Sequence, residues 1–215
     1  MKRVFLFISI IALYSLIGCV PNEPVDNGNK TVGNLDLYSQ QKVVVTHSNK
    51  KLSAVHLESL GAFKKSFGYY SAFAVNIAED FSIWTDHNSL QAAKAEAFGA
   101  CKLKSNDASG CIVYASIIPK DYTPKEGSIT LGSEATESYK GAFLKSLRNN
   151  KYGAFAVNLT EGYGWGVGIS KEKAIEAALE ACAKTEYVTM YYATKTWRKY
   201  LKPHHFKCHI VDIRS

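Results

Sequence analysis

The chain has 215 residues, of which 47% are hydrophobic and 21% are charged, and its formal net charge is +7. This composition excludes a largely disordered chain, because disordered chains lack the apolar residues that build a core. A charge of this size is mildly basic, so it suits an anionic surface and gives little support for nucleic-acid binding. We therefore expect no nucleic-acid partner.

The N-terminus carries the most specific signal. Met1-Lys2-Arg3 is positively charged, and residues 4–17 form an apolar run that is short for a bilayer span and typical of an export signal. The run ends in Leu16-Ile17-Gly18-Cys19, which resembles the signal of bacterial lipoproteins. The resemblance implies cleavage before Cys19 and lipidation of that cysteine. A plain secretory signal or an uncleaved anchor is the alternative.

We therefore expect residues 1–18 to be a signal peptide and residues 19–41 to be a lipidated, flexible tether rich in Pro, Gly, Asn and Asp. Removal of Lys2 and Arg3 lowers the formal charge from +7 to +5. Because Val20 is not Asp, the lipoprotein resemblance also implies the outer membrane. The expected location is the bacterial cell envelope.

The rest of the sequence repeats one pattern. Ser71-Ala72-Phe73-Ala74-Val75-Asn76 and Gly153-Ala154-Phe155-Ala156-Val157-Asn158 each lead into an aromatic strand, a serine and an alanine-rich run ending in cysteine. Upstream, Gly61-Ala62-Phe63-Lys64-Lys65-Ser66 and Gly141-Ala142-Phe143-Leu144-Lys145-Ser146 agree at five of six positions. We predict an α+β fold, a tandem repeat of two small helix–strand–strand–helix–strand units with antiparallel sheets.

The first unit is expected over residues 42–118, a linker over 119–133 and the second unit over 134–215. Strands are predicted at 42–46, 111–118, 187–194 and 206–213, from their β-branched and aromatic content. Ser89 and Ser170 are predicted helix N-caps.

Alternation predicts two unlike faces for the repeated strand. Large side chains such as Phe73 and Val75 point one way and alanines the other. In the second unit the next strand alternates Tyr, Trp and Val with Gly164, Gly166 and Gly168. Close packing of the alanine-rich helix on these glycines is one interpretation, and a glycine-floored binding groove is the other.

Four cysteines remain in the exported part, where disulfides persist. Each unit has one cysteine at its helix end and one on a later strand, so we pair Cys101 with Cys111 and Cys182 with Cys208. Free or metal-binding thiols are the alternative.

The combination of Tyr-Gly-Ala-x-Ala, an aromatic–glycine strand, Ala-Ala-Leu-x-x-Cys and a later Cys resembles a family of small secreted bacterial domains of unknown function. The match covers residues 150–212 well and residues 70–118 less well. It implies an exported sheet-and-helix domain whose cysteines tie the helix to the following strand, and it implies no known reaction. The second unit departs from the family in spacing its cysteines more widely, which leaves that pair open.

Candidate chemistry is sparse. His204, His205, Cys208 and His209 look like metal ligands, but on one strand His205 and His209 would be about 13 Å apart, too far for one ion. Ser170-x-x-Lys173 matches a serine acyl-enzyme pattern whose other elements are missing. The turn carboxylates Glu79, Asp80 and Glu161 are expected to be solvated. We expect no metal, no cofactor and no catalytic set.

The candidate binding surface is a segment in which cations alternate with aromatic rings. Its members are Trp197, Arg198, Lys199, Tyr200 and Lys202. Such a segment suits sugar rings or anionic polymer, and the alternative is a solvated loop anchored to the core by Trp197 and Tyr200. The functional hypothesis is a lipid-anchored binding module for a partner protein or a cell-wall glycan, with an inhibitor or immunity protein as one concrete form. A periplasmic hydrolase and a structural envelope component are the alternatives.

Overall fold

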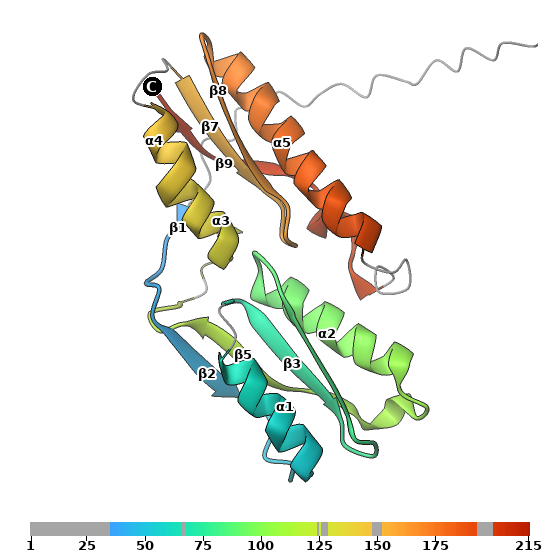
Figure 1. Cartoon of the computed structure of the whole chain (residues 1–215). Helices are drawn as coiled ribbons and strands as arrows, with labels where there is room; N and C mark the ends of the chain where they lie inside the picture. Colours follow the sequence, from blue (N-terminus) through green and yellow to red (C-terminus); the bar gives the residue numbers. More distant parts are fainter. Residues whose placement is uncertain (1–34, 66–67, 124, 126–128, 148–151, 193–199) are drawn as a thin grey trace, which may run out of the picture. The chain divides into compact units, whose positions relative to one another are not determined.

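The computed structural model describes residues 35–65, 68–123, 125, 129–147, 152–192 and 200–215. It is a mixed α+β structure with two antiparallel sheets (Figure 1). Among these residues no helix has both the length and the apolar character needed to cross a membrane.

The first sheet has four antiparallel strands in the order β2-β5-β3-β4. They are β2 (Lys42–Thr46), β3 (Ser71–Asn76), β4 (Phe81–Asp86) and β5 (Cys111–Pro119). Helix α1 (Ala54–Lys65) packs on one face and helix α2 (Leu90–Lys104) on the other (Figure 1). The short 3-10 helix η1 (Ala108–Gly110) connects α2 to β5.

The second sheet has three antiparallel strands in the order β8-β7-β9. They are β7 (Tyr152–Val157), β8 (Tyr163–Gly168) and β9 (His209–Arg214). One face packs on a helical stretch made of α3 (Ser133–Ser138), the π-helical turn η2 (Tyr139–Phe143) and α4 (Leu144–Ser146). The other face packs on α5 (Lys171–Tyr192).

A third, two-stranded sheet pairs β1 (Leu35–Asp36) with β6 (Ile129–Thr130) in parallel. The two strands lie in stretches that the sequence assigned to the tether and to the linker. Strands of two residues carry no readable alternation, so pattern analysis could not find them.

In both sheets the central strand has large side chains on one face and small side chains on the other, as predicted. Phe73 and Val75 belong to the cluster under α1, whereas Ala72 and Ala74 belong to the cluster under α2. The strand β7 divides its residues in the same way between the cluster under α3 and η2 and the cluster under α5. Small side chains on one face let the alanine-rich helices lie close to the sheet.

Close packing also explains the glycines of β8. A Cβ atom on Gly166 would lie 2.5 Å from the Cβ of Ala177 and 2.6 Å from the backbone oxygen of Ala174. A Cβ on Gly164 would lie 2.3 Å from the backbone nitrogen of Cys182. The helix therefore occupies the space beside this strand face, and the alternative of a glycine-floored groove is wrong.

The predicted N-caps and the predicted cysteine pairs are confirmed. Ser89 accepts a hydrogen bond from the Ala92 backbone N–H at 3.5 Å, and Ser170 accepts one from that of Lys173 at 3.3 Å. The sulfurs of Cys101 and Cys111, 10 residues apart, lie at disulfide distance, and so do those of Cys182 and Cys208, 26 residues apart.

Two local predictions near the C-terminus are wrong. The strand expected at 187–194 does not form over the described part of that range, because α5 continues to Tyr192. No Gly or Pro interrupts this segment, so the helix continues through residues whose own preference is for strand. The last strand starts at His209 instead of Phe206, and the 3-10 helix η5 (Pro203–His205) precedes it.

Candidate functional site

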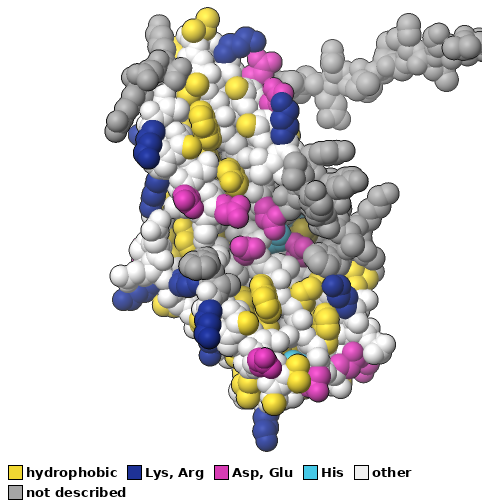
Figure 2. All heavy atoms as spheres, viewed as in Figure 1, with side chains coloured by type: hydrophobic (Ala, Val, Ile, Leu, Met, Phe, Trp, Pro, Cys, Tyr) yellow, Lys and Arg dark blue, Asp and Glu magenta, His cyan; other side chains and the backbone are white. Residues whose placement is uncertain are grey.

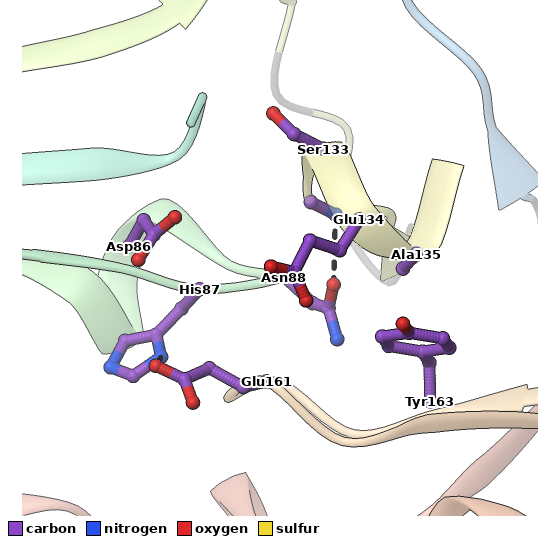
Figure 3. A pocket seen from close by; sticks show the side chains of 9 residues that line it. Asp86, His87, Asn88, Ser133, Glu134, Ala135, Glu161 and Tyr163 are labelled. Carbon is purple, nitrogen blue, oxygen red and sulfur yellow. Dashed lines mark hydrogen bonds and ion pairs between the residues drawn. The ribbon is translucent and has the colours of Figure 1, made fainter. Parts of the chain in front are cut away.

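The described residues form a small pocket where β4, α3 and the turn before β8 meet. Its volume is about 150 Å³. The pocket is lined by Asp86, His87, Asn88, Gly132, Ser133, Glu134, Ala135, Glu161 and Tyr163 (Figure 3). These residues come from three segments that lie far apart in the sequence, so the site exists only in the folded chain.

Asn88 holds the three segments together. Its side-chain Nδ2 donates to the carbonyl oxygens of Asn158 at 3.2 Å and of Gly162 at 3.1 Å. Its Oδ1 accepts from the backbone N–H of Gly132 at 2.8 Å, the bond that is dashed in Figure 3. The backbone oxygen of Asn88 also accepts from the hydroxyl of Thr130, and only 3% of the residue is exposed. The hydrogen bonds of the buried Asn88 side chain therefore hold together the three segments that line the pocket.

The turn that carries Glu161 is fixed by a second buried amide. The Oδ1 of Asn158 accepts from the backbone N–H of Thr160 at 3.0 Å, from that of Gly162 at 2.8 Å and from the Thr160 hydroxyl at 2.9 Å. Asn76, at the matching position of β3, accepts from the Ala78 backbone N–H at 3.0 Å. Side chains of this kind lock turns because they replace backbone hydrogen bonds.

His87 lies at the floor of the pocket and pairs with a buried carboxylate. Its Nε2 forms a short contact with Oε2 of Glu96, which lies on α2. The two side chains are only 4% and 10% exposed. A buried carboxylate is costly unless it is paired, so this contact stabilises both groups and fixes the orientation of the ring.

The other ring nitrogen of His87 has no hydrogen-bond partner within the described part of the chain, although it is buried. This Nδ1 lies 3.9 Å from Oε1 of Glu161, whose side chain is 42% exposed. Figure 3 shows the carboxylate of Glu161 next to the imidazole ring. The separation exceeds the length of a hydrogen bond, which is about 2.7–3.2 Å, so the two atoms do not bond directly.

Tyr163 forms an aromatic wall of the pocket. Burial, followed by the negative charges of Glu134 and Glu137, raises the pKa of the Tyr163 hydroxyl above its ordinary value of 10.0. The ring therefore keeps its proton at neutral pH. Glu134, from α3, and Tyr163, from β8, both line the pocket (Figure 3).

The pocket is acidic although the chain is basic. Its nine lining residues include three carboxylates and neither Lys nor Arg. On the face shown in Figure 2, acidic side chains gather in one group beside a histidine. An electronegative pocket with an aromatic wall attracts a cationic group and repels an anionic one.

His205 is another buried histidine, and its backbone is hydrogen-bonded to the loop that leads to Glu161. Its Nδ1 accepts a hydrogen bond from the backbone N–H of Lys202 at 2.8 Å, which requires that nitrogen to be unprotonated. Burial, and then the charges of His204, Lys202 and His87, lower the pKa of His205 below 6.5. Its backbone oxygen accepts from the N–H of Leu159, in the loop that leads to Glu161.

The predicted site residues fall into two groups. Cys19 and the patch residues Trp197, Arg198 and Lys199 lie outside the described residues, and their roles stay predictions. In the described part of the patch, Lys202 is exposed. The ring of Tyr200 packs on α2, because a Cβ on Gly99 would lie 2.2 Å from it.

The remaining candidates lie in other surroundings. His205 belongs to a 3-10 helix and not to a strand, and the described residues hold no group of three or more His, Cys, Asp or Glu suited to a metal ion. Glu79 accepts from the backbone N–H of Asp107 at 2.7 Å and fixes a turn. Glu161 lies in a turn with its side chain 42% exposed, and its carboxylate also lines the pocket beside His87.

Sequence reasoning missed His87 and Glu96. The available signal was Glu96 itself, the one acidic residue of α2. It falls on the same helix face as Ala92, Ala93, Ala97 and Ala100, which are buried. A carboxylate on a buried small-residue face requires a buried partner.

Comparison with protein-family models, with curated proteins and with solved structures found no match to this chain. The resemblance to small secreted bacterial domains therefore stays a prediction.

Proposed function

We propose that this chain is a lipid-anchored binding module of the bacterial cell envelope, and that it binds a partner protein through the acidic pocket. The observation that carries the proposal is the Nδ1 atom of His87, which is buried and has no hydrogen-bond partner among the described residues, beside a pocket lined by three carboxylates. A buried polar atom without a partner is costly, and a bound group that pairs with it removes that cost.

The size of the pocket favours a protein over a glycan. Pockets for whole small molecules usually measure about 300–1,000 Å³. This one, at about 150 Å³, admits a single side chain. Protein interfaces often depend on a few side chains that insert into such pockets. An inhibitor or immunity protein that captures an envelope enzyme is one form this function takes.

The pocket proposal is tested by photo-crosslinking in cells that express the full chain. A photoreactive benzoylphenylalanine in place of Glu134, at the exposed rim, is expected to give one discrete protein adduct. The same residue in place of the exposed Glu58 on α1 serves as the control position. Adding Glu161→Gln is expected to remove the adduct. Equal adducts from both positions, or an adduct that survives Glu161→Gln, would contradict the proposal.

The anchor is proposed from the Leu16-Ile17-Gly18-Cys19 signal, with the outer membrane as the expected location. Its test is metabolic labelling with a radioactive fatty acid. The wild-type chain should take up label and sediment with membranes, and Cys19→Ser should lose both properties. Label on the Cys19→Ser chain would argue against this site of lipidation.

We also propose that the two sheets arose by duplication of one unit. The supporting features are the central Ala-Phe-Ala-Val strand of each sheet, the same order of strands and helices, and a register shift after the phenylalanine in both, at Phe73 and at Phe155. A crystal structure in which only one sheet carries this shift would argue against duplication.

A hydrolase is the second candidate, favoured by the pairing of His87 with Glu96. A carboxylate that orients an imidazole is the arrangement a general base needs. This alternative predicts hydrolysis of cell-wall or lipid substrates that is lost in His87→Gln. The third candidate, a structural envelope component, predicts that charge reversal of Arg198 and Lys199 changes nothing except solubility and, unlike the binding module, that the Glu134 position gives no discrete protein adduct.

A further inference from the structure

We propose that the pocket binds a primary ammonium group, the head of a lysine side chain on the partner protein, between Nδ1 of His87 and Oε1 of Glu161. This inference rests on the proposed function and names the chemistry of its ligand. It is carried by the 3.9 Å separation of these two atoms, by the lack of a hydrogen-bond partner for Nδ1 among the described residues, and by the charge around them.

The separation suits one bridging donor atom. A nitrogen about 2.8–3.0 Å from each of the two acceptors spans a gap of this length, and the two acceptors then subtend an angle of about 80–90° at the nitrogen, narrower than the tetrahedral angle. An ammonium group has three N–H donors and no acceptor, so it can bond to both atoms at once. The bond to the carboxylate is charge-assisted and is the stronger of the two.

The tautomer of His87 follows from its other contact. Nε2 faces the carboxylate of Glu96, which accepts hydrogen bonds, so in the neutral ring the proton lies on Nε2. Nδ1 then carries the lone pair, on the side of the ring that faces Glu161. Glu96 is therefore a positioning residue that keeps His87 in the form able to accept from a bound cation.

The surrounding groups select for positive charge. Asp86, Glu134 and Glu161 line the pocket, and the ring of Tyr163 lines it on the side away from His87 (Figure 3). The three carboxylates attract a cation by their charge. An anionic ligand would meet only like charge here.

The volume matches the ligand. A cavity of this size, about 150 Å³, holds a group as large as benzene, about six heavy atoms. A lysine side chain has five heavy atoms beyond Cα, so it fills the pocket with its ammonium group at the floor.

The test is a binding titration of the full chain, purified in detergent with EDTA present. The probe is the peptide acetyl-Ala-Lys-Ala-amide, and the matched control peptide carries norleucine in place of lysine. Binding is followed through the ¹⁵N signals of the histidine rings, with His87 assigned from the spectrum of His87→Gln. We expect saturable shifts of the His87 signals with the lysine peptide and none with the norleucine peptide.

Glu161→Gln is expected to weaken lysine-peptide binding about tenfold or more, because it removes the charge partner. Glu58→Gln changes the net charge equally at an exposed site and should leave binding unchanged. Tyr163→Leu provides a second pocket variant and should also weaken binding. Thermal unfolding confirms that each variant is folded.

Several results would overturn the inference: no shift with the lysine peptide, equal shifts with norleucine, or wild-type affinity in Glu161→Gln. Tighter binding of free butylamine than of the peptide would overturn the assignment to a protein side chain. If the Glu134 crosslink persists and remains sensitive to Glu161→Gln while the lysine peptide does not bind, the binding-module proposal stands and the ammonium assignment falls. If neither is seen, both fall.

Discussion

Replacement of Asn88 by alanine should destabilise the whole fold, although the residue lies in a loop between β4 and α2. The substitution removes three hydrogen bonds of the side chain, two donated to Asn158 and Gly162 and one accepted from Gly132. Only 3% of Asn88 is exposed, so water does not replace the lost partners freely.

The magnitude follows from these bonds. Each neutral hydrogen bond contributes about 1 kcal/mol net, which gives about 3 kcal/mol for the three. The buried N–H of Gly132, left without a partner, adds about 1–2 kcal/mol. The expected loss is about 3–5 kcal/mol, a large part of the 5–15 kcal/mol typical of folded domains.

Urea unfolding under non-reducing conditions measures this loss from the transition midpoint and its slope. The same substitution at the exposed Asn106 keeps the hydrogen bond that its backbone N–H donates to Glu79 at 3.3 Å, so it should cost less than about 0.5 kcal/mol. Asn88→Asp keeps the acceptor for Gly132, removes both donors and places a charge against two carbonyls, so it should destabilise at least as strongly. An Asn88→Ala chain as stable as Asn106→Ala would refute the reasoning.

Two further predictions concern packing and pH. Gly166→Ala should lower the free energy of unfolding by more than about 2 kcal/mol, because its Cβ would lie 2.5 Å from that of Ala177. The control Gly141→Ala has open space around its Cβ and should be neutral or stabilising. The urea midpoints of the two variants test the difference. His205 has a pKa lowered below 6.5 by burial, so the folded state binds fewer protons than the unfolded state and stability falls as pH decreases from about 6.5. His205→Asn keeps an acceptor for the Lys202 N–H, and its unfolding free energy should fall less than that of wild type between neutral and mildly acidic pH; equal slopes would contradict this.

Much of the fold could be predicted because the order of large and small residues in the repeated strands indicates what packs on each face of the sheet. Alternation of large and small residues in Ser71–Asn76 indicated both faces correctly, whereas the Gly-x-Gly-x-Gly strand left a closely packed helix and a binding groove open until the structure decided for the helix. The sequence failed where local preference and tertiary context disagree. The aromatic and β-branched residues at the end of α5 favour a strand by themselves, yet the helix continues through them to Tyr192.

The site was hidden for a different reason. Glu161 is far from His87 and Glu96 in the sequence, and none of the three belongs to a recognisable motif. Only the folding of α2 against β4 brings Glu96 to His87, and only the turn locked by Asn158 brings Glu161 to the other side of the ring. The residues of the patch around Trp197 are neighbours in the chain, so a sequence pattern can reveal them. The residues of a pocket need not be neighbours in the chain.

The central claim is that His87 and Glu161 together hold a cationic group. A crystal structure of the protein grown with butylammonium tests it most directly. The account predicts a nitrogen atom within hydrogen-bond distance, about 2.7–3.2 Å, of both Nδ1 of His87 and Oε1 of Glu161. A pocket in which these two atoms bond to each other, or in which the ammonium group lies elsewhere on the surface, would contradict it.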